Sequence, residues 1–288
     1  MLSHFQAAVL GTLQGVSELF PISSLGHSVI LPGLLHWQID QNADYFLTFV
    51  VATHFATALA LFLVYRNAWA RIIYGLLSSI WALEFRPTNP DAKLGFLLII
   101  GTVPAGAAGL IFQRQVQRLF ISPAAAALFL MLNGGLLYLA ERLRRNAKAS
   151  EDLNRIDERI AAQMSWWQSA KVGLTQVLAL LPGFSRTGST IAGGLLIGFS
   201  HEEALRFSFL LATPIIGAAA LLKLPVLLHS GSVFAIDNAA LGALCAAVAA
   251  CVSIKVLTRY FQTKTLTPFA IYCAAVGLLS LIVLGVAR

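Results

Sequence analysis

Two short polar segments of this sequence contain the residue types needed to bind and transfer a phosphoryl group. The first, residues 14–27, reads QGVSELFPISSLGH, and the second, residues 181–190, reads LPGFSRTGST. Together they supply a carboxylate at Glu18, several hydroxyls, an imidazole at His27 and a guanidinium at Arg186. Arginine presents a planar fork of donors that binds phosphate oxygens two at a time. These residue types therefore indicate phosphoryl chemistry.

The spacing within the first segment predicts a helix, a turn and a second helix. Gln14 and Glu18 are four residues apart, so they share one face of a helix, and Pro21 ends that helix. Ser23 and Ser24 suit the amino terminus of the following half-helix, where unpaired N–H groups attract anions. We expect the turn to form a phosphate cradle.

Glycine and hydroxyl residues around both turns are the expected substrate-binding groups. In the first segment Gly26 would allow a ligand to approach the backbone closely. The second segment repeats the arrangement and adds Arg186. The substrate-binding candidates there are Gly183, Ser185, Thr187 and Gly188, in a pattern that continues through Ser189 and Thr190. In the first segment Gln14 and Ser23 join Gly26 as substrate-binding candidates.

Each charged or imidazole residue also has a purely structural interpretation. Burying Arg186 in a membrane costs about 2.5–3.5 kcal/mol, so structure alone explains it only if it pairs with Glu18. His27 could be catalytic or could cap a hydroxyl, and His54 fits a core histidine as well as a site residue. Arg206, near a predicted span boundary, is expected to be an ion-paired anchor at the interface.

The composition places the whole chain in a membrane. Hydrophobic residues make up 58% of the sequence and charged residues 11%, against about 25% charged residues in soluble domains. The net charge of +7 comes from residues that flank apolar runs without forming a continuous patch, which argues against a nucleic-acid partner. The amino terminus lacks a basic region and a cleavage site, so we expect no removed signal peptide. The three cysteines lie in apolar runs without metal or disulfide spacing.

Apolar runs of about 20 residues predict six membrane spans. Their ranges are 44–65, 93–112, 123–141, 203–222, 238–258 and 266–286. The two polar segments are too interrupted to cross, and such backbone is tolerated at bilayer depth only inside protein or beside a wet cavity. We therefore expect two re-entrant helical hairpins. Residues 69–83 are too short to assign as a span.

Basic residues predict the orientation of these spans. If the six spans alternate, most lysines and arginines fall on one side, which the positive-inside rule places in the cytoplasm. The opposite side receives only Arg114, Arg118, Lys223 and Arg288. Both termini are then expected outside the cytoplasm, and the charged segment 142–163 is expected to be a solvated cytoplasmic connector.

An internal repeat organises the chain into two halves of a single domain, residues 1–141 and 164–288. FVVAT at 49–53 recurs as FLLAT at 209–213, and the two polar segments have a similar offset near 160 residues. Each half contains one hairpin and three spans, an odd number, so the second half is inverted. Inverted repeats bring broken-helix tips together near the midplane, with amino termini directed at anionic groups.

The motifs QGVSELFPISSLGH, LPGFSRTGSTIAGGLLIG and FSFLLATP resemble the signature regions of the undecaprenyl-diphosphate phosphatase family, also called the bacitracin-resistance family. The likeness extends over essentially the whole chain. It implies a bacterial inner-membrane enzyme that hydrolyses undecaprenyl diphosphate to the monophosphate, which recycles the lipid carrier for peptidoglycan synthesis and confers bacitracin resistance. It also implies a divalent metal and a site open to the periplasm.

Carried over by motif, the resemblance assigns catalytic roles to Glu18, Ser24, His27 and Arg186. Gln14 stands where the family allows either Glu or Gln, so this chain has one acidic residue in that helix. Mg²⁺ or Ca²⁺ would be held partly by Glu18. Ser24 would attack the terminal phosphorus with His27 as base, although attack by His27 or by metal-bound water also fits the residues. The alternative function is a polyprenyl-phosphate transporter or flippase, because inverted repeats with broken helices also occur in transporters.

Overall fold

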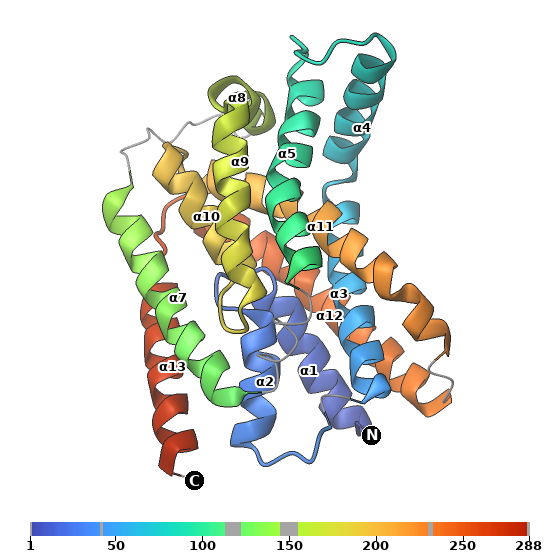
Figure 1. Ribbon diagram of the computed structural model, residues 1–288, viewed down its shortest axis with the longest axis vertical. Helices are drawn as coiled ribbons and strands as arrows, with labels where there is room; N and C mark the ends of the chain where they lie inside the picture. Colours follow the sequence, from blue (N-terminus) through green and yellow to red (C-terminus); the bar gives the residue numbers. More distant parts are fainter. Residues whose placement is uncertain (1, 41–42, 113–121, 145–154, 230–232, 287–288) are drawn as a thin grey trace.

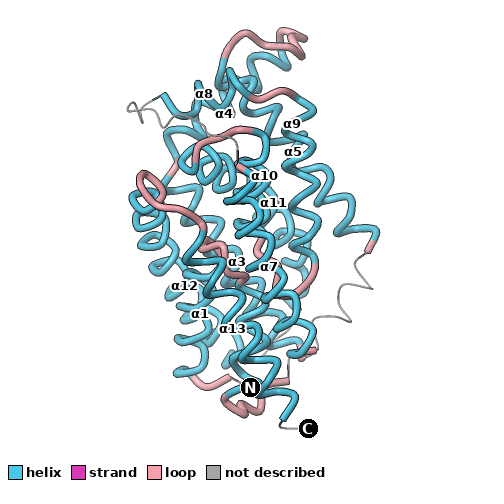
Figure 2. The backbone as a smooth tube through the Cα atoms, turned by 90° about the vertical axis from the view of Figure 1, so that its left-hand side faces the viewer, coloured by secondary structure: helices cyan, strands magenta, loops and turns pink. Residues whose placement is uncertain are grey.

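Six long helices form the body of the protein. The computed structural model describes residues 2–40, 43–112, 122–144, 155–229 and 233–286. Six helices in these ranges are long and apolar enough to cross a membrane, and their apolar stretches agree with the predicted spans to within three residues at each end. The long helices are α3 (Asp44–Val64), α5 (Pro90–Ile111), α7 (Pro123–Leu143), α11 (His201–His229), α12 (Val233–Tyr260) and α13 (Thr267–Val286). The chain is therefore an all-α, multi-pass membrane protein, and every described segment is helix or loop (Figure 2).

Two helical hairpins enter the bundle from opposite ends, as the sequence predicts (Figure 1). The first consists of α1 (His4–Ser17) and α2 (Ser24–Leu34) and enters from the end where both termini lie. The second consists of α9 (Trp166–Thr175), the 3₁₀ helix η2 (Gln176–Leu180) and α10 (Arg186–Ile197) and enters from the other end. The tips of the two hairpins meet inside the bundle.

The two hairpins begin with the same capping interactions. Ser3 and Ser165, 162 residues apart, each open a helix with a capping box, in which the serine hydroxyl and a glutamine three residues later cap each other's backbone N–H. Ser23 and Ser185, again 162 residues apart, cap α2 and α10. The starts of both helices in the two hairpins thus match at an offset of 162 residues.

The hairpins also pack against equivalent spans. A Cβ added to Gly11 in α1 would lie 2.3 Å from the carbonyl oxygen of Gly242 in α12, and one added to Gly173 in α9 would lie 2.3 Å from that of Gly101 in α5. Gly11 and Gly173 are related by the same offset. A side chain would prevent such close helix contact, so each hairpin packs through glycine against a span of the other half.

Residues 69–83, which the sequence does not assign, lie mostly in α4 (Arg66–Trp81). This helix follows α3 directly and packs along α5. It is shorter than the 18 residues that a span requires, and Trp81 at its end is 92% exposed. The segment between the spans α3 and α5 therefore forms a separate, shorter helix, α4.

The connector is not solvated throughout, contrary to the prediction. Its described part includes α8 (Ile156–Gln163), whose Ile160 is fully buried. Asp157 in this helix accepts hydrogen bonds from Nε and Nη2 of Arg206, both at 2.8 Å. Arg206 is thus ion-paired, as predicted, and its guanidinium also lies 4.1 Å from the centre of the Tyr65 ring. The helix α8 is therefore docked through a buried apolar side chain and an ion pair.

The orientation prediction depends partly on residues outside the described ranges, namely Arg114, Arg118, Arg145, Lys148 and Arg288. The helices α4, α8 and α9, which contain several of the remaining basic residues, lie at the end opposite both termini (Figure 1). This arrangement is the one expected if that end faces the cytoplasm.

Candidate active site

The amino termini of two half-helices meet at the junction of the hairpin tips. Ser24 is the first residue of α2, and Arg186 is the first residue of α10. The Ser23 hydroxyl accepts from the Gly26 N–H at 3.2 Å, and the Ser185 hydroxyl accepts from the Gly188 N–H at 3.0 Å. Helix amino ends have partial positive charge, so the junction favours an anion.

Glu18 is the central residue of this junction. Its side chain is only 8% exposed, and its Oε2 accepts hydrogen bonds from Ser24 Oγ at 2.5 Å and from Gln14 Nε2 at 3.1 Å. Its Oε1 accepts from Arg186, at 3.0 Å from Nη2 and 3.4 Å from Nε. His54 Nε2 lies 3.5 Å from Oε2. One carboxylate therefore contacts four side chains from both hairpins and α3.

Arg186 has a donor available for a ligand. Its Nη2 and Nε bind Glu18, whereas its buried Nη1 has no hydrogen-bond partner among the described residues. A buried donor left unpaired costs free energy, which an incoming phosphate oxygen would recover. The guanidinium is thus held in place by the carboxylate and keeps one nitrogen without a hydrogen-bond partner in the part of the chain that the structure describes.

His27 lies in the junction but is not arranged as the base for Ser24. Its Nδ1 is 2.7 Å from the Ser23 carbonyl, and its Nε2 is 2.9 Å from the hydroxyl of Tyr272 in α13. Because a carbonyl can only accept, Nδ1 donates, and in the neutral ring Nε2 accepts from Tyr272. Both ring nitrogens are therefore occupied, and the Ser24 hydroxyl donates to Glu18 instead.

The hydroxyls of Ser185 and Thr187, two of the predicted substrate-binding residues, join the two hairpins. Thr187 Oγ1 donates to the Glu18 carbonyl at 2.9 Å, and Ser185 Oγ contacts the Phe20 carbonyl at 3.4 Å. Both carbonyls lie beyond the end of α1, where no helical N–H can satisfy them. These side chains consequently stabilise the junction.

The glycines of the two turns allow the tips to touch each other and α7. Gly183 has φ +112°, and a Cβ there would lie 2.3 Å from the Ala126 carbonyl oxygen of α7. A Cβ at Gly26 would lie 2.9 Å from the Cα of Gly183, and one at Gly188 would lie 3.1 Å from the Leu137 side chain. A side chain at any of these three positions would therefore collide with the other tip or with α7.

Three residues reach the junction from spans that the motifs do not include. His54 comes from α3, Tyr272 from α13 and Asn133 from α7. His54 fits two interpretations from sequence alone, and no sequence signal distinguishes Tyr272 from other aromatic residues in apolar runs. Asn133 could have been noticed as an amide within an apolar span, where polar residues are rare.

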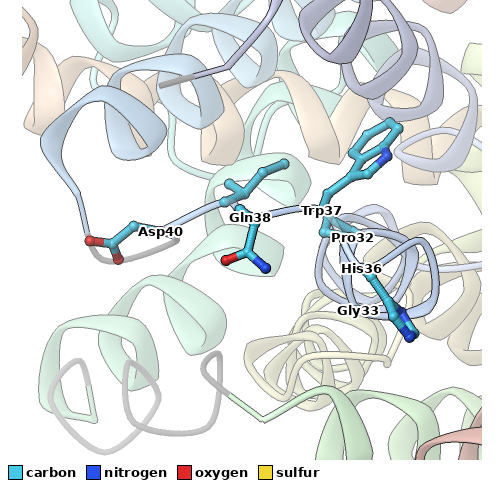
Figure 3. Close-up of a pocket in the computed structure, with 7 residues that line it drawn as sticks. Pro32, Gly33, His36, Trp37, Gln38 and Asp40 are labelled. Carbon is cyan, nitrogen blue, oxygen red and sulfur yellow. The ribbon is translucent and has the colours of Figure 1, made fainter.

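A separate cavity of about 420 Å³ lies at the other end of α2, around Trp37, Gln38 and Asp40. Its side chains point in different directions and do not converge on one point (Figure 3). The cavity lining begins at Pro32, eight residues after Ser24, so the cavity lies about 12 Å along α2 from the junction at 1.5 Å per residue. The candidate site is therefore the junction.

A metal ion bound by protein groups alone does not fit the junction. No group of three His, Cys, Asp or Glu side chains suited to a metal occurs among the described residues. Glu18 is the one acidic side chain in the contacts described above, and Gln14 contributes an amide. Mg²⁺ often binds through one or two carboxylates together with substrate phosphates, so a metal here would take most ligands from the substrate and water. Glu18 could bind it only by giving up one of its four hydrogen bonds.

Residues 7–279 match the protein family described as "Bacitracin resistance protein BacA". The chain belongs to this family. This BacA-family protein is 42% identical over 299 residues to an "Undecaprenyl-diphosphatase" of Mycolicibacterium paratuberculosis, covering 98% of this chain and 97% of that protein. It is 44% identical over 285 residues to an "Undecaprenyl-diphosphatase" of Acidiphilium cryptum, covering 96% and 97%. An "Undecaprenyl-diphosphatase 2" of Chromobacterium violaceum is 42% identical over 289 residues, covering 98% and 99%.

Proposed function

We propose that this BacA-family protein is an integral membrane phosphatase that hydrolyses undecaprenyl diphosphate to undecaprenyl phosphate and phosphate. The observation on which the proposal depends is the contact set of Glu18, which holds the Ser24 hydroxyl and the Arg186 guanidinium at one buried point. The names of the full-length relatives support the same reaction. The product is the lipid carrier used in peptidoglycan synthesis, and its recycling accounts for bacitracin resistance.

Ser24 is the proposed nucleophile. Its hydroxyl donates to Glu18 Oε2 at 2.5 Å, so this carboxylate can take the proton while Oγ forms a bond to the terminal phosphorus. The bond from phosphorus to the undecaprenyl phosphate oxygen then breaks. In a second step water attacks the phosphorus of phosphoserine, the bond from phosphorus to Oγ breaks, and Glu18 returns its proton to Oγ as phosphate leaves. Direct attack by His27 has less support, because both its nitrogens are in hydrogen bonds.

Arg186 and the two helix amino termini would bind the diphosphate. Phosphoryl transfer chiefly requires positioning of the groups and neutralisation of charge on the phosphate oxygens. The Nη1 of Arg186 is a buried donor for such an oxygen, and Glu18 prevents the guanidinium from rotating away. His54, 3.5 Å from Glu18, lies at the same site and would orient the carboxylate.

We propose that Mg²⁺ or Ca²⁺ accompanies the substrate, with Glu18 as its protein carboxylate. Such an ion, when bound, neutralises charge on the diphosphate. Because Glu18 is the one acidic side chain in the junction contacts described above, the ion would take most of its ligands from the lipid diphosphate and water.

The protein is proposed to lie in the bacterial inner membrane with the site open to the periplasm. The first hairpin enters from the end where both termini lie, and the basic residues favour the other end as cytoplasmic (Figure 1). The isoprenoid tail would lie along the apolar spans and needs no polar contacts. The junction favours an enzyme over a transporter, since a serine hydroxyl bound to a carboxylate serves covalent chemistry.

The test is phosphate release from undecaprenyl diphosphate by the purified protein in detergent, with and without divalent metal. We expect metal-dependent release that Glu18→Gln abolishes. The matched control is Glu141→Gln, because the Glu141 carboxylate is 10% exposed against 8% for Glu18 but binds Arg144, His201 and the Leu266 N–H away from the junction. Lipid binding without phosphate release by the wild-type protein would refute the proposal and favour a transporter.

A further inference from the structure

Asn133 is a fully buried amide in the middle of α7, a span that is otherwise almost entirely apolar up to Glu141. Polar side chains inside membrane spans cost free energy and are retained where they have a specific partner. Asn133 has several such partners.

The carboxamide of Asn133 binds one backbone group from each hairpin. Its Nδ2 donates to the Pro21 carbonyl of the first hairpin at 3.1 Å, and its Oδ1 accepts from the Ser185 N–H of the second at 3.1 Å. Nδ2 also lies 3.4 Å from the Cys273 sulfur. A carbonyl can only accept and an amide N–H can only donate, so these partners determine the orientation of the side chain.

The Pro21 carbonyl and the Ser185 N–H lie close in sequence to Glu18 and Arg186, the ion pair at the centre of the site. Pro21 is three residues after Glu18, and Ser185 immediately precedes Arg186. The side chain of Asn133 therefore connects the chain segment that holds the carboxylate to the segment that holds the guanidinium. The Gly183 backbone, which lies against α7 at Ala126, adds a second contact between this helix and the second tip.

We propose that Asn133 is a positioning residue that sets the relative placement of the two hairpin tips, and through them of Glu18 and Arg186. It touches neither the proposed nucleophile nor the guanidinium, so it acts on turnover through geometry. The expected effect on turnover rests on the proposed phosphatase function. The bridge, meaning the hydrogen bonds of Asn133 to the Pro21 carbonyl and the Ser185 N–H, does not depend on that function. Displacements near 1 Å in a catalytic site reduce rates by about 10²-fold.

The first variant is Asn133→Leu, which has a similar size and no hydrogen-bonding group. We expect kcat for phosphate release to fall about 10- to 100-fold while KM changes by less than about threefold. The matched control is Asn238→Leu in α12, since Asn238 is also a buried amide but donates to the Leu2 carbonyl, away from both tips. It should lower the thermal midpoint comparably and leave kcat within about twofold.

Hydrogen exchange measured by mass spectrometry tests the bridge without any activity. Peptides that cover residues 18–24 and 181–187 should exchange faster in Asn133→Leu than in Asn238→Leu, because the Ser185 N–H loses its acceptor. If Asn133→Leu does not fold, Asn133→Ala supplies the same comparison. Either Asn133 variant with kcat within twofold of wild type and unchanged exchange at both tips would overturn the proposal. An inactive wild-type protein would refute the phosphatase function, and the exchange data would still decide the bridge.

Discussion

Replacing Arg186 is the most direct test of the junction, because this residue connects substrate binding to the buried carboxylate. The guanidinium uses Nη2 and Nε for Glu18 and leaves Nη1 for a phosphate oxygen. Arg186→Ala removes both interactions at once. Arg186→Lys keeps one positive charge but cannot bind the carboxylate and a phosphate through separate, fixed nitrogens.

The expected magnitudes follow from these contacts. Loss of one preorganised donor to a developing charge costs about 10²–10³ in kcat, or roughly 2.7–4 kcal/mol, so Arg186→Ala should lose at least that much. Removal of one partner of a buried ion pair also destabilises a protein, by about 3–5 kcal/mol, because Glu18 keeps its charge without its cation. Arg186→Lys should fold better than Arg186→Ala and remain at least about tenfold slower than wild type.

The measurement is metal-saturated phosphate release from a prenyl diphosphate, with thermal melting in detergent as the folding check. Arg206→Ala is the matched control, because the Arg206 side chain is 15% exposed against 12% for Arg186 and binds one carboxylate, Asp157, but lies outside the junction. It should lower the melting temperature and leave kcat of the folded protein nearly unchanged. A well-folded Arg186→Ala protein with near-normal kcat/KM would remove the second hairpin from the site and refute the reasoning.

Three further predictions concern the nucleophile, the histidine and the orientation. Ser24→Ala should keep diphosphate binding and lose nearly all turnover, and a kcat above about a tenth of wild type would exclude covalent catalysis at this residue. Tyr272→Phe removes only the hydroxyl bound to His27, so kcat should fall about 2- to 10-fold with an unchanged melting temperature; equal kinetics would show that this hydrogen bond is not used. In a protein without the native cysteines, Gln38→Cys should react with an impermeant thiol reagent from the periplasmic side and Glu158→Cys only from the cytoplasmic side. The reverse pattern would invert the topology.

The helices and the location of the site are predictable from the sequence because their signals are local. Apolar runs of span length give the six long helices, and the proline, glycine and serine positions of the two polar segments give the hairpin turns and their caps. The repeat implies that the hairpins enter from opposite ends, because an odd number of spans precedes the second one. The sequence alone therefore predicts that Glu18 and Arg186 lie close together.

The pairing of side chains within the junction is decided by the tertiary structure. His27 follows Ser24 by one helical turn, yet the hydroxyl of Ser24 donates to Glu18 and His27 binds Tyr272, which is 245 residues away. Asn133 and His54 likewise come from spans whose hydropathy does not reveal which face is buried. In a membrane, an apolar side chain suits lipid and protein neighbours equally, so the sequence identifies the spans but not their contacts. Only packing of the helices brings these polar groups to the hairpin tips.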